Sequence, residues 1–359
     1  MSVDRVGIVG AGLIGTSVGL ALARAGQQCL VADVDEGRAA AAAAMGAGVA
    51  VANLGGLTGC DHVVVAVPPH LTSVVVSALL ALNLDATISD VSSVKATVLA
   101  EIETLGSRAS SMCGGHPIAG RERGGPGAAQ PELFDHAVWA VTPHASTSAG
   151  AVADVVALAE RCGARPVTVS PGEHDLVLAV VSHAPQLLAS VLADQLRAAG
   201  ELGPVLAGPG FRDTTRLADS DPGLWRAIAA ANAVPLAGVL TRVADRLRAV
   251  AEALERDDAG PVEDVIRAGQ AARRLLPGKP NAARRASWAR VGVVLADRPG
   301  ELARLLAAAA AVDVNVEDLA IEHAADHPVG FVDLEVREAD VGVLVGRLTR
   351  EGWAAHRTR

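Results

Sequence analysis

The sequence has 359 residues and is acidic, because 31 Lys and Arg residues stand against 40 Asp and Glu residues and give a formal net charge of −9. This charge opposes general binding to nucleic acid or to an anionic membrane, since both are polyanions. Four cysteines without CxxC pairs or metal-like spacing argue against a disulfide framework and a metal site, and favour a reducing, cytoplasmic location.

The start of the chain predicts neither a signal peptide nor a membrane span. The first apolar segment begins at residue 5, which leaves no room for the charged region of a leader before it. Further along the chain, Gly, Arg, Asp and His interrupt each apolar run, so we expect none to reach the roughly 18 to 20 residues that cross a bilayer.

Short β-branched segments alternate with alanine-rich segments over residues 1–171. The predicted strands cover 6–9, 28–32, 62–67, 87–90, 138–142 and 166–169. Because their apolar runs are continuous rather than alternating, we expect a parallel, doubly wound sheet with helices on both faces. The fold class is therefore α/β, with a first domain of the Rossmann type.

Two further domains follow. Residues 172–286 contain long Ala/Leu/Arg segments without a convincing strand, and they predict an all-helical domain that ends in a Pro/Gly cluster at 276–281. Residues 287–359 return to mixed structure in the order strand, helix, strand, strand, helix, strand. This βαββαβ order predicts a compact ferredoxin-like module.

A glycine-rich turn follows the first predicted strand and opens the first helix. Gly10, Gly12 and Gly15 have the spacing of a dinucleotide fingerprint, in which the phosphates lie at the helix N-terminus. Asp33 ends the second strand, where a carboxylate would bind a ribose hydroxyl and favour NAD; Arg38 nearby leaves NADP open. The other predicted cofactor contacts are Leu13, Ile14, Val67 and Pro68.

Several polar segments are candidates for catalysis. His116 is flanked by Gly-Gly and by Pro, so we expect it on a rigid, irregular loop at the sheet edge where a nicotinamide would project. Each histidine taken alone is more often a surface or core residue than a catalyst. The remaining candidates are Ser93 before the fourth helix, and His174, His183, Gln186, Asp213 and Arg216 in the helical domain.

Over essentially its whole length the chain resembles the prephenate/arogenate dehydrogenase family of tyrosine biosynthesis. Four motifs match in order: the glycine-rich start at 10–17, Asp-Val-x-Ser-Val-Lys at 90–95, Gly-His-Pro-x-Ala-Gly-x-Glu at 115–122, and Gly-Phe-x-Asp-x-Thr-Arg at 210–216. The resemblance implies NAD-dependent oxidation of prephenate, loss of carbon dioxide and formation of 4-hydroxyphenylpyruvate. It also implies a homodimer formed through the helical domain.

The resemblance assigns roles to the candidates. It implies that His116 is the general base and that Ser93 helps to orient it and the nicotinamide. Arg216 would bind a substrate carboxylate with Asp213 in support, and Glu122 would lie at the pocket entrance. By the same resemblance, the substrate side is lined by His174 and His183.

One departure leaves the substrate open. Many prephenate-specific relatives have His-x-Pro-His where this chain has His183-Ala-Pro-Gln186, and a glutamine carries no charge. A contact that an imidazole makes elsewhere must here be a neutral hydrogen bond or be absent. Arogenate, the transaminated relative of prephenate, is therefore the alternative substrate.

The C-terminal module resembles an ACT domain, a regulatory module that binds amino acids. Asp297, Pro299 and Gly300 form the turn between its first strand and helix, and Asn315 matches the other side of the family's ligand pocket. Tyrosine, as end product, is the expected effector. The alternative is a module that serves only structure or dimerisation, because Asp-x-Pro-Gly is also an ordinary turn.

Two other functions compete with this interpretation. A β-hydroxyacid dehydrogenase shares the plan of domains but needs a lysine from the helical domain, whereas this chain has only Lys95 and Lys279. A non-catalytic sensor of NAD and amino acids would need only the fingerprint and the C-terminal module. Such a sensor would not explain why His116, Ser93 and Arg216 occur together in one chain.

Overall fold

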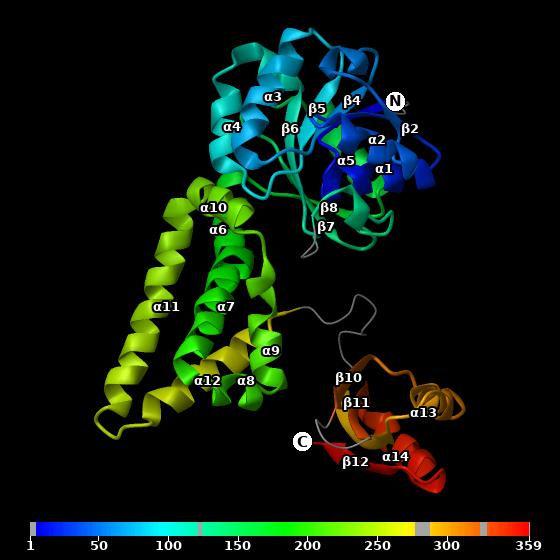
Figure 1. Ribbon diagram of the computed structural model, residues 1–359, viewed down its shortest axis with the longest axis vertical. Coiled ribbons are helices and arrows are strands. Elements are labelled where there is room, and N and C mark those ends of the chain that lie inside the picture. Colours follow the sequence, from blue (N-terminus) through cyan, green and yellow to red (C-terminus); the bar gives the residue numbers. More distant parts are fainter. Residues whose placement is uncertain (1–4, 121–123, 277–287, 324–328, 359) are drawn as a thin grey trace. The chain divides into compact units, whose positions relative to one another are not determined.

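The computed structural model describes residues 5–120, 124–276, 288–323 and 329–358 (Figure 1). The chain divides into two compact units, Met1–Arg248 and Ala249–Arg359, and each is considered by itself.

The first unit is built on an eight-stranded sheet with the order β3-β2-β1-β4-β5-β6-β7-β8. Its strands are β1 (Arg5–Val9), β2 (Gln28–Ala32), β3 (Val49–Ala50), β4 (His62–Val65), β5 (Thr87–Asp90), β6 (Met112–Pro117), β7 (Val138–Thr142) and β8 (Arg165–Thr168). The first six strands have the order of a dinucleotide-binding fold, which confirms the predicted fold class.

Three features of the sheet differ from the expectation, and the first is the short edge strand β3, which was not among the predicted strands. β7 pairs with β6 in the antiparallel direction, so the sheet is mixed rather than wholly parallel. The segment β6 is a strand that the sequence pattern did not predict. Its two adjacent glycines weaken the strand signal, although Met112 and Cys113 pair with Ile88 and Ser89 of β5 in the core.

Helices cover the sheet, and their packing explains the composition. These helices are α1 (Leu13–Arg24), α2 (Glu36–Ala44), α3 (Pro69–Ala81), α4 (Ala96–Glu103) and α5 (Ala149–Arg161). Their buried faces consist largely of Ala, Val and Leu, which meet the β-branched strands. Two of the seven Phe and Trp residues meet in this core, where the rings of Phe134 and Trp139 lie 5.4 Å apart with both side chains fully buried.

A helical part completes the first unit. It contains α6 (Pro171–Leu178), α7 (Ala184–Asp194), α8 (Leu202–Leu206), α9 (Pro209–Thr215), α10 (Pro222–Ala231) and α11 (Ala233–Leu254), the last of which continues into the second unit. Ser170 begins α6 with a capping box, because its hydroxyl accepts from the N–H of Glu173 while Glu173 reaches back. A π-helical segment, Ala179–His183, joins α6 to α7.

The run Pro171–Ala199 is long and apolar enough to cross a membrane by length and composition alone, contrary to the expectation from sequence. The pair α10 and α11 passes the same test only if it is joined across a bend of 98°. Buried helices of soluble proteins also pass this test. The run carries His174, Asp175 and His183, all buried and polar, and Asp175 bonds to backbone of the nucleotide-binding part, so this helix packs against protein.

The second unit contains α12 (Gly260–Arg273) and a four-stranded antiparallel sheet with the order β10-β11-β9-β12. The module consists of β9 (Trp288–Ala296), α13 (Glu301–Ala310), β10 (Asp318–His323), β11 (Val329–Arg337), α14 (Val341–Arg350) and β12 (Ala354–Thr358). Alternate residues of β9 and β11 pack against α13 and α14 in one core, as the βαββαβ pattern predicts.

Candidate active site

The glycine-rich turn between β1 and α1 has the geometry that a dinucleotide needs. Gly10 has φ +104°, and a Cβ there would collide with the carbonyl of Ala66. A Cβ on Gly15 would collide with the carbonyl of Gly10, so the helix can approach the turn only with glycine there. A Cβ on Gly12, in contrast, would meet open space, which is where the backbone can approach a pyrophosphate.

Asp33 lies at the end of β2, beside this turn. Its carboxylate accepts hydrogen bonds from the N–H of Ala11 at 2.7 Å and from the N–H of Asp35 at 2.8 Å. These bonds hold the carboxylate at the carboxyl edge of the sheet. A carboxylate at this place suits a ribose hydroxyl and repels a 2′-phosphate.

His116 lies in β6 and not on an irregular loop, which corrects the expectation. The ladder between β5 and β6 covers only Ile88 and Ser89 of β5, so the backbone of Gly115 extends past it. Side chains replace the missing strand: the N–H of Gly115 donates to Asp90 Oδ1 at 3.2 Å, and its carbonyl accepts from Lys95 Nζ at 2.7 Å. The backbone next to His116 is thereby held from both sides.

Lys95 and Asp90 form an ion pair, and both side chains are fully buried. The Asp90 oxygen that pairs with Lys95, Oδ2, also accepts a hydrogen bond from the N–H of Ser92 at 3.0 Å. Glycine is required at the centre of this arrangement, because a Cβ on Gly115 would lie 2.8 Å from both the Asp90 carbonyl and Trp139 Nε1. This packing is the physical reason for the Gly-Gly that precedes His116.

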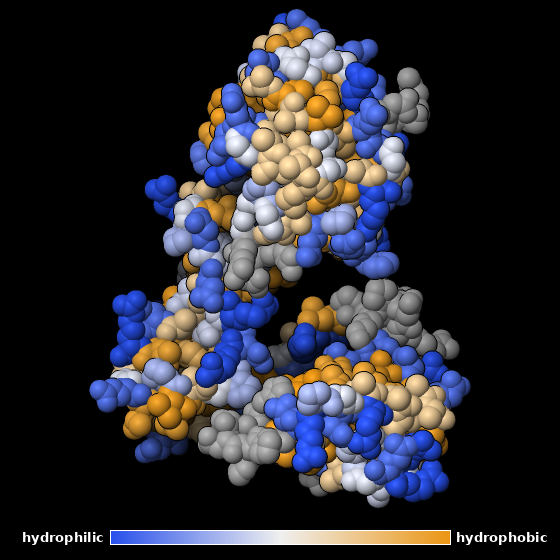
Figure 2. All heavy atoms as spheres, turned by 45° about the vertical axis from the view of Figure 1, so that its right-hand side comes forward, coloured by the Kyte–Doolittle hydropathy of each residue, from blue (hydrophilic) through white to orange (hydrophobic). Residues whose placement is uncertain are grey.

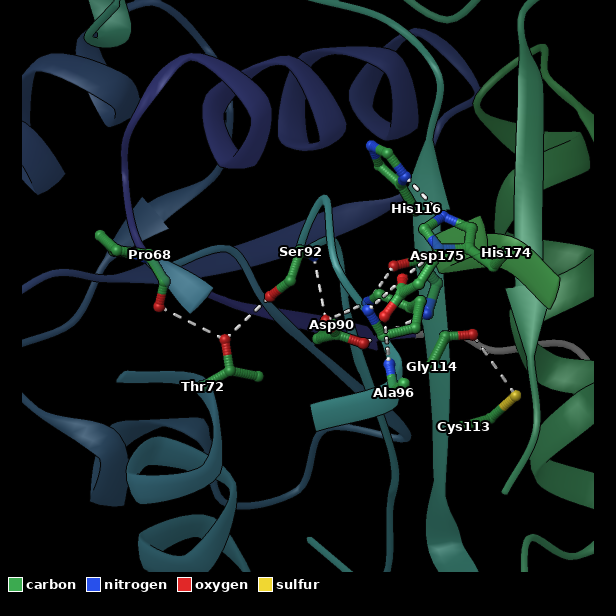
Figure 3. A network of polar contacts seen from close by, with 12 residues as sticks. Pro68, Thr72, Asp90, Ser92, Ala96, Cys113, Gly114, His116, His174 and Asp175 are labelled. Atoms are coloured by element: carbon green, nitrogen blue, oxygen red, sulfur yellow. Dashed lines mark hydrogen bonds and ion pairs between the residues drawn. The ribbon is translucent and has the colours of Figure 1, made fainter. Parts of the chain in front are cut away.

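A chain of hydrogen bonds links His116 to the helical part, as Figure 3 shows. His116 Nδ1 lies 2.8 Å from His174 Nε2, and His174 Nδ1 lies 2.8 Å from Asp175 Oδ1. The Asp175 carboxylate also accepts from the N–H groups of Lys95 at 2.9 Å and Ala96 at 2.8 Å. Asp175, in the middle of α6, therefore joins the helical part to the loop after β5.

This series of hydrogen bonds determines which nitrogen of each histidine ring carries a proton. A carboxylate accepts, so His174 Nδ1 donates to Asp175; in the neutral ring, His174 Nε2 is then an acceptor and receives the Nδ1 proton of His116. The lone pair of His116 lies on Nε2 as a result. Burial, together with the nearby His174, Lys95 and His183, holds the pKa of His116 well below 6.5, so the ring is neutral at pH 7.

His183 reaches the same region because of the π-helical segment. In an α-helix the nine positions from His174 to His183 make two and a half turns, which would point the two side chains in opposite directions. The wider π turn changes that phase, and both side chains are buried. The His183 ring meets Trp225 edge to face at 6.0 Å, and burial lowers its pKa.

The other candidates form a second group, with Asp213 and Arg216 on α9 and the turn after it and Gln186 on α7. Gln186 is 5% exposed, and both ends of its amide are used: Nε2 donates to the Leu217 carbonyl at 2.6 Å, and Oε1 accepts from Ser220 Oγ at 3.2 Å. Gln186 thus holds the turn that carries Arg216. Arg216 and Asp213 themselves are exposed.

Two predicted residues remain to be placed. Ser93 is half-buried between β5 and α4, and its neighbour Ser92 rather than Ser93 joins the network, through Thr72 Oγ1 at 2.9 Å. Glu122 lies outside the described residues. Asp90 was identified only as part of a motif, and no role was predicted for Asp175 or Asn232, because the roles of all three depend on contacts with distant segments.

Comparison with known proteins agrees with this geometry. Residues 18–168 match the family "Prephenate dehydrogenase, nucleotide-binding domain" and residues 170–267 match "Prephenate dehydrogenase, dimerization domain". The chain is 31% identical to the probable prephenate dehydrogenase NovF of Streptomyces niveus, over 97% of this chain and 98% of the relative. It belongs to the prephenate dehydrogenase family.

Solved structures support the same family. The prephenate dehydrogenase of Aquifex aeolicus, in complex with hydroxyphenyl propionate and NAD+, has a TM-score of 0.70 and 26% identity over 76% of this chain and 98% of that chain. The arogenate dehydrogenase of Synechocystis has a TM-score of 0.65 and 26% identity over 75% of this chain and 99% of that chain. As a member of this family, this chain is an NAD-dependent oxidoreductase. The two competing functions, a non-catalytic sensor and a β-hydroxyacid dehydrogenase, are thereby excluded.

Proposed function

We propose that the chain is a prephenate dehydrogenase that oxidises prephenate with NAD to 4-hydroxyphenylpyruvate and carbon dioxide. The observation that carries this proposal is the buried chain from Asp175 through His174 to His116, next to the carboxyl edge of a dinucleotide-binding sheet. It supplies a neutral base for a hydroxyl proton. The names of the relatives NovF and the Aquifex enzyme support the same substrate.

The cofactor would lie over the glycine-rich turn, with its ribose toward Asp33 and its nicotinamide end beside Val67 and Pro68. When bound, NAD accepts the hydride from the carbinol carbon of the substrate. His116 Nε2 takes the hydroxyl proton in that step, because its lone pair is the free one. Loss of carbon dioxide then makes the ring aromatic, so the reaction is effectively irreversible.

The substrate contacts come from both groups of residues. Arg216 can bind a carboxylate with two parallel hydrogen bonds, with Asp213 one turn before it in support. Gln186 supports this contact by holding the turn at Leu217, because its amide donates to the Leu217 carbonyl. Ser93 would lie near the nicotinamide, and Glu122 is assigned to the entrance by its motif alone.

Arogenate is the second candidate substrate, because Gln186 is neutral and the Synechocystis relative is an arogenate dehydrogenase. The deciding experiment supplies prephenate or arogenate, each with NAD or NADP, and measures reduced cofactor and the aromatic product. We expect the highest kcat/KM with prephenate and NAD, with 4-hydroxyphenylpyruvate formed. Turnover of arogenate alone, giving tyrosine, would establish the other specificity, and turnover of neither would refute the proposed function.

We further propose a cytoplasmic homodimer formed through the helical part. Hydrophobic side chains reach the surface of the molecule in patches (Figure 2). On the run from α6 to α7 they include Leu176, Val177, Val180, Val181, Leu188, Val191 and Leu192. Val181 and Val191 are each 63% exposed. Such a stripe on a helix is typical of a protein interface, and it accounts for the apolar character of this run.

The C-terminal module supports a regulatory role that would need two copies. Asp297, Pro299 and Gly300 follow the end of β9, and Asn315 precedes β10. β10 runs in the same direction as β9, because both are antiparallel to β11, so Asn315 lies beside the start of β9. The two parts of the candidate ligand site, the turn at 297–300 and Asn315, are then on the order of 20 Å apart within one chain. A ligand that contacts both would bridge two modules.

Tyrosine is the proposed effector of this module. We expect tyrosine to raise the Tm of the full-length enzyme and to lower its activity. Gly300→Ala tests the site, because Gly300 has φ +91° and a side chain disfavours this turn conformation. That variant should keep its basal kcat and lose the response to tyrosine. A wild-type enzyme whose Tm and activity ignore tyrosine would refute this effector.

A further inference from the structure

Asn232 occupies the break between α10 and α11. It ends α10 with φ −114° and ψ 31°, and its side chain is only 2% exposed. A buried amide at such a break must find partners for its hydrogens, because an unsatisfied buried polar group costs free energy. No role for this residue was predicted from the sequence.

The partners of Asn232 fix the orientation of its amide. Its Nδ2 lies 2.8 Å from the carbonyl oxygen of Asp175, which can only accept, so the amide nitrogen and not the oxygen faces Asp175. The same Nδ2 lies 3.0 Å from His183 Nδ1. The second amide hydrogen therefore points at His183 Nδ1, and that ring nitrogen must be the acceptor.

An acceptor at Nδ1 sets the tautomer of His183. The side chain is 1% exposed, and its burial lowers its pKa, so the neutral ring dominates at pH 7. A neutral ring with a lone pair on Nδ1 carries its proton on Nε2. Among the residues that the structure describes, Nε2 of His183 has no hydrogen-bond partner, so this donor is left for a ligand.

We propose that Asn232 is a positioning residue that keeps His183 as an Nε2–H donor to a carboxylate or carbonyl oxygen of the substrate. The proposal rests on the proposed function. It gives the two histidines opposite tasks: His116 presents a lone pair, and His183 presents a hydrogen. Asp175 contributes to both arrangements. Its carboxylate orients His174, which contacts His116, and its backbone carbonyl orients Asn232, which contacts His183.

The first test needs no substrate. In the full-length wild-type enzyme with 15N-labelled histidine, the His183 ring nitrogens are assigned by their loss in His183→Phe and read by long-range proton–nitrogen NMR at pH 7. We expect an unprotonated Nδ1 and a protonated Nε2. A proton on Nδ1, or on both nitrogens, would overturn the proposal. This result does not depend on which substrate the enzyme turns over, so it is separable from a failure of the proposed function.

The second test asks whether Asn232 acts through His183. With whichever substrate is turned over, we expect Asn232→Ala and His183→Phe each to raise KM about tenfold, the effect of one hydrogen bond to a charged group, with a smaller change in kcat. The double variant should be no worse than His183→Phe, since one change removes what the other positions. Asn232→Asp should move the His183 proton to Nδ1.

The matched control is Asn53→Ala, which removes an exposed asparagine and should leave KM unchanged. Independent, multiplicative effects of Asn232→Ala and His183→Phe on KM would show that Asn232 supports the fold rather than His183, and would overturn the proposal. An unchanged KM in His183→Phe would overturn it as well, because the ring would then have no donor role.

Discussion

Replacement of His116 by Asn should lower kcat about 100-fold or more while leaving the affinity for NAD unchanged. The amide lacks a basic nitrogen, so no group takes the hydroxyl proton as hydride leaves. Asn is small enough to fit beside His174, and the glycine-rich turn is untouched. Steady-state kinetics give kcat, and titration of the variant with NAD gives the cofactor affinity. A kcat near that of the wild type would contradict the assignment of His116 as the base.

The pH profile provides an independent check of the same assignment. The base works in its neutral form, so activity falls when the pH drops below its pKa; because burial and neighbouring His174 and Lys95 lower that pKa, the acid limb of kcat/KM should lie well below pH 6.5. The limb should disappear in His116→Asn. The control is His136→Asn, since His136 is exposed and has φ 63°, a conformation that Asn tolerates. An acid limb above pH 6.5 in the wild type would count against the buried base.

Replacement of Lys95 by Met should destabilise the enzyme by about 3 to 5 kcal/mol, the cost of breaking a buried ion pair. The ammonium is fully buried against Asp90 and also donates to the Gly115 carbonyl, so the change leaves a buried carboxylate and a buried acceptor without this partner. In a chain of this size we expect Tm to fall by about 4 to 7 °C. Urea denaturation and thermal unfolding measure the two quantities.

Two further variants separate the buried pair from a general loss of charge. Arg248→Met removes an ion pair to Asp245 in which both side chains are more than half exposed, and it should change stability by less than about 1 kcal/mol. Adding Asp90→Asn to Lys95→Met removes the unpaired charge and should restore part of the lost stability. If Lys95→Met is as stable as Arg248→Met, the buried pair is not what holds β6.

The cofactor half of the site could be predicted because its signals are local. Gly10, Gly12 and Gly15 lie within six residues, in one turn and the first turn of the helix that follows it, and each has the conformation or the clearance that its place in the fingerprint requires. Asp33 follows a strand whose bounds agree with the prediction. A tight turn between a strand and a helix is determined by a few neighbouring residues, so the sequence carries nearly all of its information.

The catalytic half could be predicted only as a set of residue types. His116 and His174 were identified by motif, but their hydrogen bond joins residues 58 positions apart. The strand β6 was missed because glycines hide its pattern, and its reason for carrying them lies in Trp139 and Asp90. The antiparallel entry of β7 likewise follows from pairing with β6 and not from its own apolar run.

The sequence by itself determined the α/β fold class, the dinucleotide turn and the set of candidate histidines, because periodicity and turn chemistry act over a few residues. Only the tertiary structure decided which nitrogen of each ring carries a proton. That choice depends on a carboxylate, a carbonyl and an amide delivered by different helices: Asp175 sets His116 through His174, and Asn232 sets His183. The π-helical segment that turns His183 inward is also decided by the tertiary structure, since packing and not local propensity determines it.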